Sequence, residues 1–309
     1  MSKLLAVNII QDIATELVLE EAFIEKDWYA VEALKIVGGM KGTFNPVFSG
    51  GTSLSKGYNL IQRFSEDLDF KVIPLTSEES SRKERKNFRD LLIERLNASP
   101  HFKVITDTME SGNENKFFKF DIEYPIQYAS EKRTLRPHLR IEVGFHNSLS
   151  LPEQKKQVKS FIDQFSEKVE AFHIDCVSPV ETAADKASAL IWRVHTRDRT
   201  QPLGSKNNDP TLIRHLHDLC ALKETSLEAL EFKKALEQAY ENDQDRGGGK
   251  MKEIPLSKAL ASTYKIIQED PLYAKEYEEF VNGMSYARDE DLITYEKALS
   301  GLEGYVGLI

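Results

Sequence analysis

Residues 48–70, FSGGTSLSKGYNLIQRFSEDLDF, constrain the fold more than any other stretch of this 309-residue chain. A short apolar run leads into two glycines and then into a helical pattern over residues 52–63, with Leu54, Tyr58 and Ile61 on one face. The stretch ends in DLDFKVI, where polar and apolar residues alternate. This order predicts a strand, a glycine turn, a helix and a second strand, which together fold back and bring both ends of the unit close to each other.

The glycine pair predicts an anion site. Glycines let a ligand approach the backbone closely, and the N–H groups at the start of a helix attract negative charge. The predicted phosphate-binding residues are Gly50, Gly51, Thr52 and Ser53, with Lys56 as a further candidate by position. The alternative is that Thr52 and Ser53 only cap the helix. The spacing differs from GxxxxGK[ST], which excludes a Walker A loop.

Asp67 and Asp69 are the predicted metal ligands. Alternate side chains of a strand share one face, so both carboxylates point the same way while Leu68 points into the core. Two carboxylates on one face repel each other unless a cation lies between them, and Mg²⁺ prefers such hard oxygen ligands. The alternative is a solvated strand face on which the aspartates pair with Arg63 or Lys71.

A third carboxylate from a neighbouring strand would complete this metal site. Glu142 in LRIEVGF and Asp121 in KFDIEY are the candidates, and Glu142 is favoured because Ile141 and Val143 on either side of it are suited to burial. The expected cofactor is Mg²⁺, with Mn²⁺ as the alternative, and the expected substrate is an NTP. Two metal ions at aspartates can activate an attacking hydroxyl and stabilise a pyrophosphate leaving group.

The pattern of hydrophobic residues changes near the middle of the chain. Before it, helical patterns mix with alternating runs, which predicts an α/β (α+β) domain with a mixed sheet over residues 1–150. After it, segments such as PEQKKQVKSFIDQF and PVETAADKASALIWRVH have helical periodicity. A mainly α-helical domain is therefore expected over residues 151–309.

Composition limits the possible partners. The formal charge of −9 disfavours general binding to nucleic acid or to an anionic membrane, and no uncharged run is long enough for a membrane span. Two cysteines are too few for a disulfide framework, so a cytoplasmic location is expected. An RNA partner would need local basic surface from RKERK (82–86), KKQVK (155–159) or RVHTRDR (193–199). Such runs are also common on solvated helix faces.

Four segments together resemble the AbiEii/AbiGii toxin family of nucleotidyltransferases, within the polymerase-beta-like superfamily. They are residues 48–70, IEKDW (24–28), VSPVETAADKASALIWR and RHLHDLCAL, and the resemblance extends over about residues 24–222. It departs from the wider superfamily in one respect, because fifteen residues separate Gly51 from Asp67. The helix or the turn after it must therefore be longer than usual.

The resemblance implies a nucleotidyltransferase-like fold and four catalytic residues, Asp67, Asp69, Lys186 and Asp218. Lys186 lies at the border of the apolar stripe of its helix, where burial is costly without a partner. It could meet a phosphate or Asp218, and the alternative is a helix-to-helix salt bridge without a catalytic role. His217 is expected to be a structural neighbour of Asp218.

The implied function is a Mg²⁺-dependent nucleotidyltransferase that acts as the toxin of a toxin-antitoxin or abortive-infection system. It would transfer a nucleotide from an NTP to an RNA acceptor, with the tRNA 3′ end as the leading candidate, and a cognate antitoxin is an expected partner. Two alternatives remain open on the same residues. One is an NTP-binding regulator without transfer activity, and the other is an enzyme that places a nucleotide on a protein hydroxyl.

Overall fold

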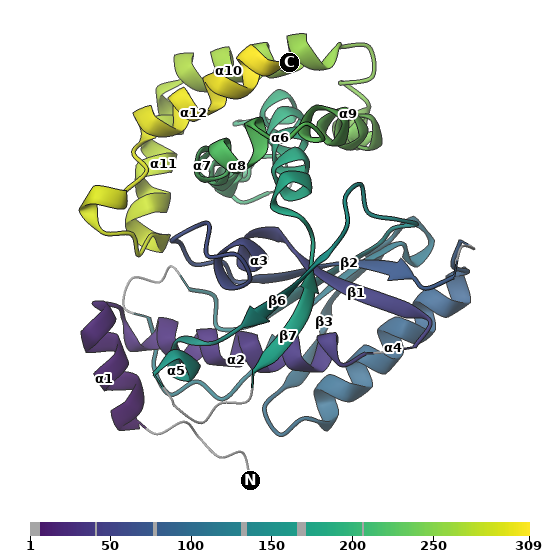
Figure 1. The fold of residues 1–309 in the computed structure, drawn as a ribbon, viewed down its shortest axis with the longest axis vertical. Helices are drawn as coiled ribbons and strands as arrows, with labels where there is room; N and C mark the ends of the chain where they lie inside the picture. Colours follow the sequence, from purple (N-terminus) through teal and green to yellow (C-terminus); the bar gives the residue numbers. More distant parts are fainter. Residues whose placement is uncertain (1–6, 41, 77–78, 131–134, 166–170, 206) are drawn as a thin grey trace. The chain divides into compact units, whose positions relative to one another are not determined.

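The computed structural model describes residues 7–40, 42–76, 79–130, 135–165, 171–205 and 207–309 (Figure 1). The chain forms two compact units. Unit 1 contains the chain up to Asn59 together with Phe64–Val177, and unit 2 contains Leu60–Arg63 and Ser178–Ile309. The main change of unit thus follows Val177, and not residue 150 as the sequence predicts.

The described part of unit 1 contains a seven-stranded mixed sheet in the order β3-β4-β5-β2-β1-β7-β6. β2 runs parallel to β5 and β1 parallel to β7, whereas the other neighbouring pairs are antiparallel. The mixed sheet predicted for the first part of the chain is confirmed. The strands are β1 (Phe44–Ser49), β2 (Asp67–Pro74), β3 (Lys103–Gly112), β4 (Phe117–Glu123), β5 (Leu139–Phe145), β6 (Gln154–Val158) and β7 (Phe172–Cys176).

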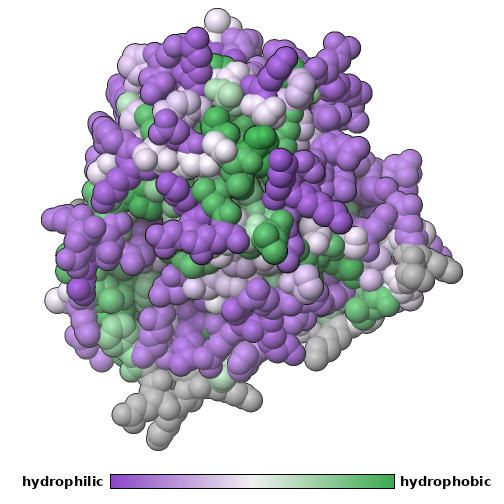
Figure 2. Space-filling view, turned by 45° about the horizontal axis from the view of Figure 1, so that its top comes forward, coloured by the Kyte–Doolittle hydropathy of each residue, from purple (hydrophilic) through white to green (hydrophobic). Residues whose placement is uncertain are grey.

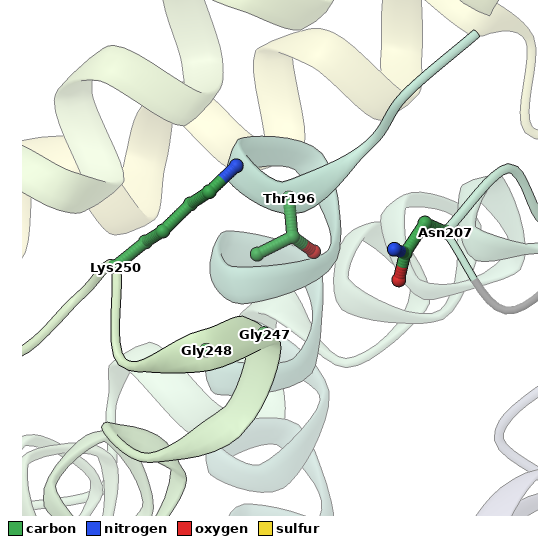
Figure 3. Close-up of a pocket in the computed structure, with 5 residues that line it drawn as sticks. All are labelled: Thr196, Asn207, Gly247, Gly248 and Lys250. Atoms are coloured by element: carbon green, nitrogen blue, oxygen red, sulfur yellow. The ribbon is translucent and has the colours of Figure 1, made fainter. Parts of the chain in front are cut away.

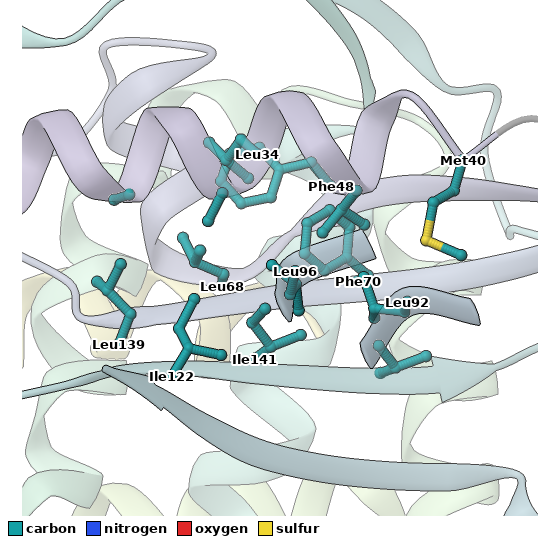
Figure 4. Close-up of a cluster of buried hydrophobic side chains, with 14 of the residues drawn as sticks. Leu34, Met40, Phe48, Leu68, Phe70, Leu92, Leu96, Ile122, Leu139 and Ile141 are labelled. Atoms are coloured by element: carbon teal, nitrogen blue, oxygen red, sulfur yellow. The ribbon is translucent and has the colours of Figure 1, made fainter. Parts of the chain in front are cut away.

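One face of this sheet is the core of unit 1. Alternation in β2 places Leu68, Phe70 and Val72 on that face, where they are almost fully buried. Helices α2 (Glu21–Gly38) and α4 (Arg82–Ala98) supply Leu34, Leu92 and other apolar side chains to the same cluster (Figure 4). Each fully buried leucine or phenylalanine contributes about 1.5–3 kcal/mol relative to exposure. The other face carries polar side chains at Asp69 and Glu142.

The remaining helical segments of unit 1 are short or peripheral. They are α1 (Val7–Leu17), α3 (Gly50–Lys56), η1 (Asn113–Asn115) and α5 (Phe161–Gln164). The helix predicted over residues 52–63 ends at Lys56, because Gly57 follows and Asn59 adopts a positive φ of 55°. The predicted helix in PEQKKQVKSFIDQF is wrong, since this segment forms the edge strand β6 and then α5. Because β6 and β7 belong to the sheet of unit 1, this unit extends to Val177.

Unit 2 is helical, as predicted (Figure 1). Its central helix α6 (Pro179–Thr196) begins at the cap residue Ser178 with Pro179 in the first position, an arrangement that favours helix initiation. α6 packs against α7, α9 and α10. The other segments are η2 (Pro210–Ile213), α7 (Arg214–Ala221), α8 (Lys223–Leu227), α9 (Phe232–Asp243), η3 (Arg246–Gly248), α10 (Leu256–Glu269), α11 (Pro271–Met284), η4 (Asp289–Asp291) and α12 (Tyr295–Leu308).

The surface seen in Figure 2 is largely hydrophilic, with hydrophobic areas between the charged side chains. Charged residues make up 29% of the sequence, which accounts for this character. Within the described ranges, no helix combines the length and the apolar character needed to cross a bilayer.

Candidate active site

The glycine turn between β1 and α3 brings the two ends of the predicted unit together. Gly50 has a φ of 75°, in the left-handed region that favours glycine, and a Cβ at this position would collide with the carboxylate of Asp69. β1 and β2 pair with Ser49 opposite Asp69. Thr52 Oγ1 donates a hydrogen bond to the Asp67 carbonyl at 2.6 Å. The start of α3 therefore lies directly beside the aspartate-bearing end of β2.

The side chains of Ser53 and Lys56 are buried or paired inside unit 1. Ser53 is fully buried beside the thiol of Cys176. Lys56 forms an ion pair with Asp27 of α2, and its ammonium lies 3.8 Å from the ring centroid of Phe161. These contacts stabilise the packing of α3. The groups that the turn offers to a phosphate are therefore the first backbone N–H groups of α3, which have no acceptor within the helix.

The register of the sheet places Glu142 next to the aspartate pair. β2 and β5 are parallel, with Asp69 aligned with Glu142 and Asp67 aligned with Arg140. Aligned residues of neighbouring strands share one face, so the carboxylates of Asp67, Asp69 and Glu142 lie on the polar face of the sheet. This is the arrangement expected of the predicted third carboxylate.

The other candidate, Asp121, is occupied by structural partners. Its carboxylate receives hydrogen bonds from Arg140 Nε and Nη2 at 2.7 and 3.1 Å, and His138 Nε2 lies 3.1 Å from it. Asp121 is only 2% exposed. Burial lowers the pKa of His138 despite this carboxylate. Asp121 is thus engaged by Arg140 and His138, and Glu142 stays the predicted third carboxylate.

The oxygen donors of Asp67, Asp69 and Glu142 suit a divalent cation, and the Asp69 carboxylate lies against the backbone of Gly50. In this conformation the donors are not gathered around one point. Among the described residues, no three His, Cys, Asp or Glu side chains form a metal-binding group. The chemistry of these three carboxylates fits a metal, and they would have to converge to hold it.

A buried network that the sequence did not predict reaches Asp67 from the other side. Arg136 Nη2 donates to Asp67 Oδ1 at 2.6 Å, and Arg136 Nε donates to Glu66 Oε2 at 3.2 Å. Lys26 of α2 forms an ion pair with Glu66 and donates to the Arg136 carbonyl at 2.6 Å. Burial lowers the pKa of Lys26, whereas Asp67 and Glu66 outweigh burial and raise the pKa of Arg136. In the sequence, this network is indicated only by the segment IEKDW, which places three consecutive charged residues in a helix that is otherwise largely apolar.

Lys186 and Asp218 pair within unit 2, as expected of them. Lys186 Nζ lies 2.7 Å from Asp218 Oδ2, and Arg63 donates to both carboxylate oxygens at 2.7 and 2.5 Å. Asp218 is fully buried, and His217 Nδ1 lies 3.4 Å from it. Burial alone would raise the pKa of Asp218, but Arg63 and Lys186 outweigh it and hold this pKa well below its ordinary range.

Arg63 also accounts for the long spacing between the glycines and the aspartate pair. The short helix α3 uses few of the intervening residues, and Leu60–Arg63 belong to unit 2. There the backbone of Arg63 forms a bridge with Ser285, and Tyr286 N donates to the Gln62 carbonyl at 3.0 Å. The extra residues are thus a strap that packs in unit 2. The sequence suggested Arg63 as a partner of the aspartate pair, but its partner is Asp218.

Internal ion pairs neutralise the arginines of one of the three basic runs. In residues 193–199, Arg193 binds Asp209, Arg197 binds Glu276, and Arg199 binds both Asp270 and Glu276. In residues 82–86, Arg85 is buried and Lys86 pairs with Asp90. In residues 155–159, Lys155 is exposed on the edge strand β6. Arg82 and Lys83 of the second run are exposed as well, so residues 82–86 and 155–159 both offer accessible basic surface.

Unit 2 also contains a pocket of about 340 Å³ (Figure 3). It is lined by Thr196, Asn207, Gly247, Gly248 and Lys250. None of the sequence-predicted site residues lines it. The glycine turn and the carboxylates of β2 and β5 carry the chemistry, so they are the candidate active site.

A mixed sheet with a glycine turn, a short helix and a strand bearing two aspartates defines a nucleotidyltransferase fold. The model of the AbiEii nucleotidyl transferase toxin family, of type IV toxin-antitoxin systems, matches residues 42–300. The chain belongs to this family and is a nucleotidyltransferase toxin. Family membership implies an NTP donor, a divalent metal and a cognate antitoxin.

The whole fold is similar to a solved structure of MenT4, a nucleotidyltransferase toxin from Mycobacterium tuberculosis H37Rv. The TM-score is 0.54 with 15% sequence identity, and the alignment covers 97% of this chain and 98% of that chain. At this identity the likeness shows the fold alone. No curated protein matches the chain.

Proposed function

We propose that this toxin is a Mg²⁺-dependent enzyme that transfers a nucleotide from an NTP to RNA in the cytoplasm, with the tRNA 3′ end as the leading acceptor. The observation that carries the proposal is the contact geometry at Gly50. A missing side chain there lets the start of α3 lie against the Asp69 carboxylate. This contact supports a phosphate-binding role for the backbone at residues 50–53 and a metal-binding role for the neighbouring Asp69 carboxylate.

Each group of residues has a role in this proposal. The first backbone N–H groups of α3, at residues 50–53, bind the β- and γ-phosphates. Asp67, Asp69 and Glu142 hold Mg²⁺, or Mn²⁺ in its place, which when bound activates the acceptor hydroxyl and neutralises the leaving pyrophosphate. Lys56 keeps the structural contact with Asp27.

Lys186 and Asp218 are proposed to act as a pair. Asp218 is fully buried and bound to Arg63 and Lys186, so it serves as a positioning residue. Lys186 is 7% exposed and binds the Asp218 carboxylate, so the two residues are proposed to support the site as one buried pair. Basic surface for RNA is assigned to residues 155–159, whose lysines include the exposed Lys155.

The test is a transfer assay with Mg²⁺, each α-³²P-labelled NTP in turn and total bacterial tRNA. Wild type should label the RNA, and Asp69→Asn should lower the rate by about 10³-fold or more, because a charged metal ligand is lost. Asp107→Asn is the matched control, since Asp107 is exposed on β3. Full transfer by Asp69→Asn would reject the assignment.

The same assay separates the two alternatives. Label on the protein fraction in place of RNA would identify transfer to a protein hydroxyl. Measurable NTP binding without label on either acceptor would identify a regulator that does not transfer.

A further inference from the structure

Arg136 is held in place by its backbone and by one edge of its guanidinium. Its backbone N–H donates to Glu66 Oε1 at 2.7 Å, and its Nε donates to Glu66 Oε2 at 3.2 Å. Glu66 is itself fixed by the buried ammonium of Lys26. The other end of the guanidinium reaches Asp67 Oδ1 at 2.6 Å. The anchor and the contact with Asp67 therefore use different nitrogens of one side chain.

Burial differs along this network. Glu66 is 9% exposed and Lys26 only 4%, whereas the side chain of Arg136 is 30% exposed. A guanidinium is permanently charged and has five donors in a rigid fork. Within the part of the chain that the structure describes, Glu66 and Asp67 occupy Nε and Nη2, and the N–H groups of Nη1 remain for a further acceptor. Oxygens of a phosphate match this fork well.

Arg136 also reduces the electrostatic repulsion between neighbouring carboxylates. Asp67 and Asp69 lie on one face and repel each other without a cation. Arg136 supplies positive charge at Asp67 in the absence of metal, and it does so at an oxygen that a metal would need. A divalent ion and Arg136 therefore compete for the same carboxylate.

We propose that Arg136 is a placeholder cation, which occupies Asp67 until a divalent metal displaces it and which then donates its guanidinium to the triphosphate of the incoming NTP. Glu66 and Lys26 are positioning residues that keep Arg136 within reach of both partners. The inference rests on the proposed function, because it takes Asp67 and Asp69 as metal ligands.

The first experiment measures Mn²⁺ binding to the full-length protein without nucleotide, by isothermal titration calorimetry. Arg136→Gln should bind Mn²⁺ about tenfold more tightly than wild type, because a charge-assisted hydrogen bond no longer competes. Arg89→Gln is the matched control: Arg89 pairs with Asp90 at 2.9 Å on α4, and its variant should bind Mn²⁺ like wild type.

The second experiment measures binding of a non-hydrolysable NTP analogue at saturating Mn²⁺. Arg136→Gln should weaken this affinity about tenfold, in the opposite direction to its effect on the metal alone. Arg136→Lys keeps a positive charge without the fork, so it should restore wild-type Mn²⁺ affinity while nucleotide binding stays weakened. Thermal unfolding of each variant reports whether the fold is intact.

Unchanged or weaker Mn²⁺ binding by folded Arg136→Gln overturns the placeholder role. Asp69→Asn separates this failure from a failure of the proposed function. If Asp69→Asn abolishes Mn²⁺ binding while Arg136→Gln leaves it unchanged, the metal site stands and only the role of Arg136 is rejected. If Asp69→Asn has no effect on Mn²⁺ binding, both proposals fail.

Discussion

Each of the two units contains an aspartate that is bound by an arginine. The two ion pairs differ in how easily the arginine can be replaced by another partner. In unit 1, Asp67 is bound by Arg136, whose side chain is 30% exposed. In unit 2, the side chain of Asp218 is fully buried. Arg63 and Lys186 bind it, and Arg63 is itself only 2% exposed. Solvent access lets the first pair open for a ligand. The second pair is a permanent part of the fold.

Energetics follow from this difference. Breaking a buried pair by removing one partner leaves an uncompensated charge in a medium of low polarity, which is strongly destabilising. A partly exposed pair contributes less, since water can replace either partner. Substitutions at Asp218 should therefore act mainly on stability, and substitutions near Asp67 mainly on binding and transfer.

The largest effect on stability is expected from Asp218→Ala. Arg63 and Lys186 would be left buried without their carboxylate, which should lower the free energy of unfolding by about 3–5 kcal/mol. Urea unfolding followed by circular dichroism measures this loss. Asp209→Ala is the control, because Asp209 and Arg193 form a partly exposed pair worth about 1 kcal/mol or less. Equal losses in the two variants would contradict the distinction between the sites.

An intermediate effect is expected from Gly50→Ala, which reaches the unit 1 site through the backbone. The left-handed φ and the collision with Asp69 should cost about 1–3 kcal/mol of stability, and the displaced carboxylate should lower transfer about 10–100-fold. Urea unfolding and the labelling assay measure the two effects. Gly112→Ala should change neither, since Gly112 has an extended φ of −145° and open space around it. Wild-type transfer by Gly50→Ala would show that Asp69 does not need this close approach.

The smallest effect concerns pH and the histidine beside the Asp218 cluster. Burial lowers the pKa of His215 well below its ordinary value, and Lys186, Arg193 and Arg214 lower it further against the opposing effect of Asp218. Below about pH 6.5 the unfolded chain binds a proton that the folded chain does not, so the free energy of unfolding should fall as the pH falls below this value. The full contribution of neutral His215 is present above it.

This pH dependence is measured as the difference in unfolding free energy between pH 7.5 and pH 5.5, taken as roughly one unit on either side of the ordinary histidine pKa. His215→Gln should reduce the difference, and His173→Gln, at an exposed position of β7, should leave it as in wild type. The same difference in His215→Gln and wild type would mean that the ring is protonated in the folded state.

Local sequence patterns predicted those secondary-structure elements whose conformation is set by residues close together in the chain. The strand, glycine turn and helix of residues 48–56, the alternation in β2 and the helical character of unit 2 follow from periodicity and turn chemistry. The cost of burying an unpaired lysine predicted a partner for Lys186 but left a phosphate and Asp218 open, and the structure shows Asp218. The nucleotidyltransferase fold followed from the resemblance of these segments.

The partners of the arginines could not be predicted, because tertiary contacts select them. Arg136 lies 69 residues from Asp67, and Arg63 lies 155 residues from Asp218. Residues 154–158 were predicted as helix because lysines and glutamines have similar patterns in a helix and on an exposed edge strand. Their pairing with β7 is what identifies them as β6. Side chains assigned to phosphate by position, such as Ser53 and Lys56, face buried neighbours instead.

The strap of residues 60–63 has a consequence for the order in which the chain becomes available during synthesis. Arg63 is made 155 residues before Asp218, which at a typical elongation rate is an interval of roughly 8–30 s. Throughout that interval the connection between α3 and β2 lacks its anchor in unit 2. A nascent chain that already contains both glycines and both aspartates therefore still lacks the carboxylate that binds Arg63.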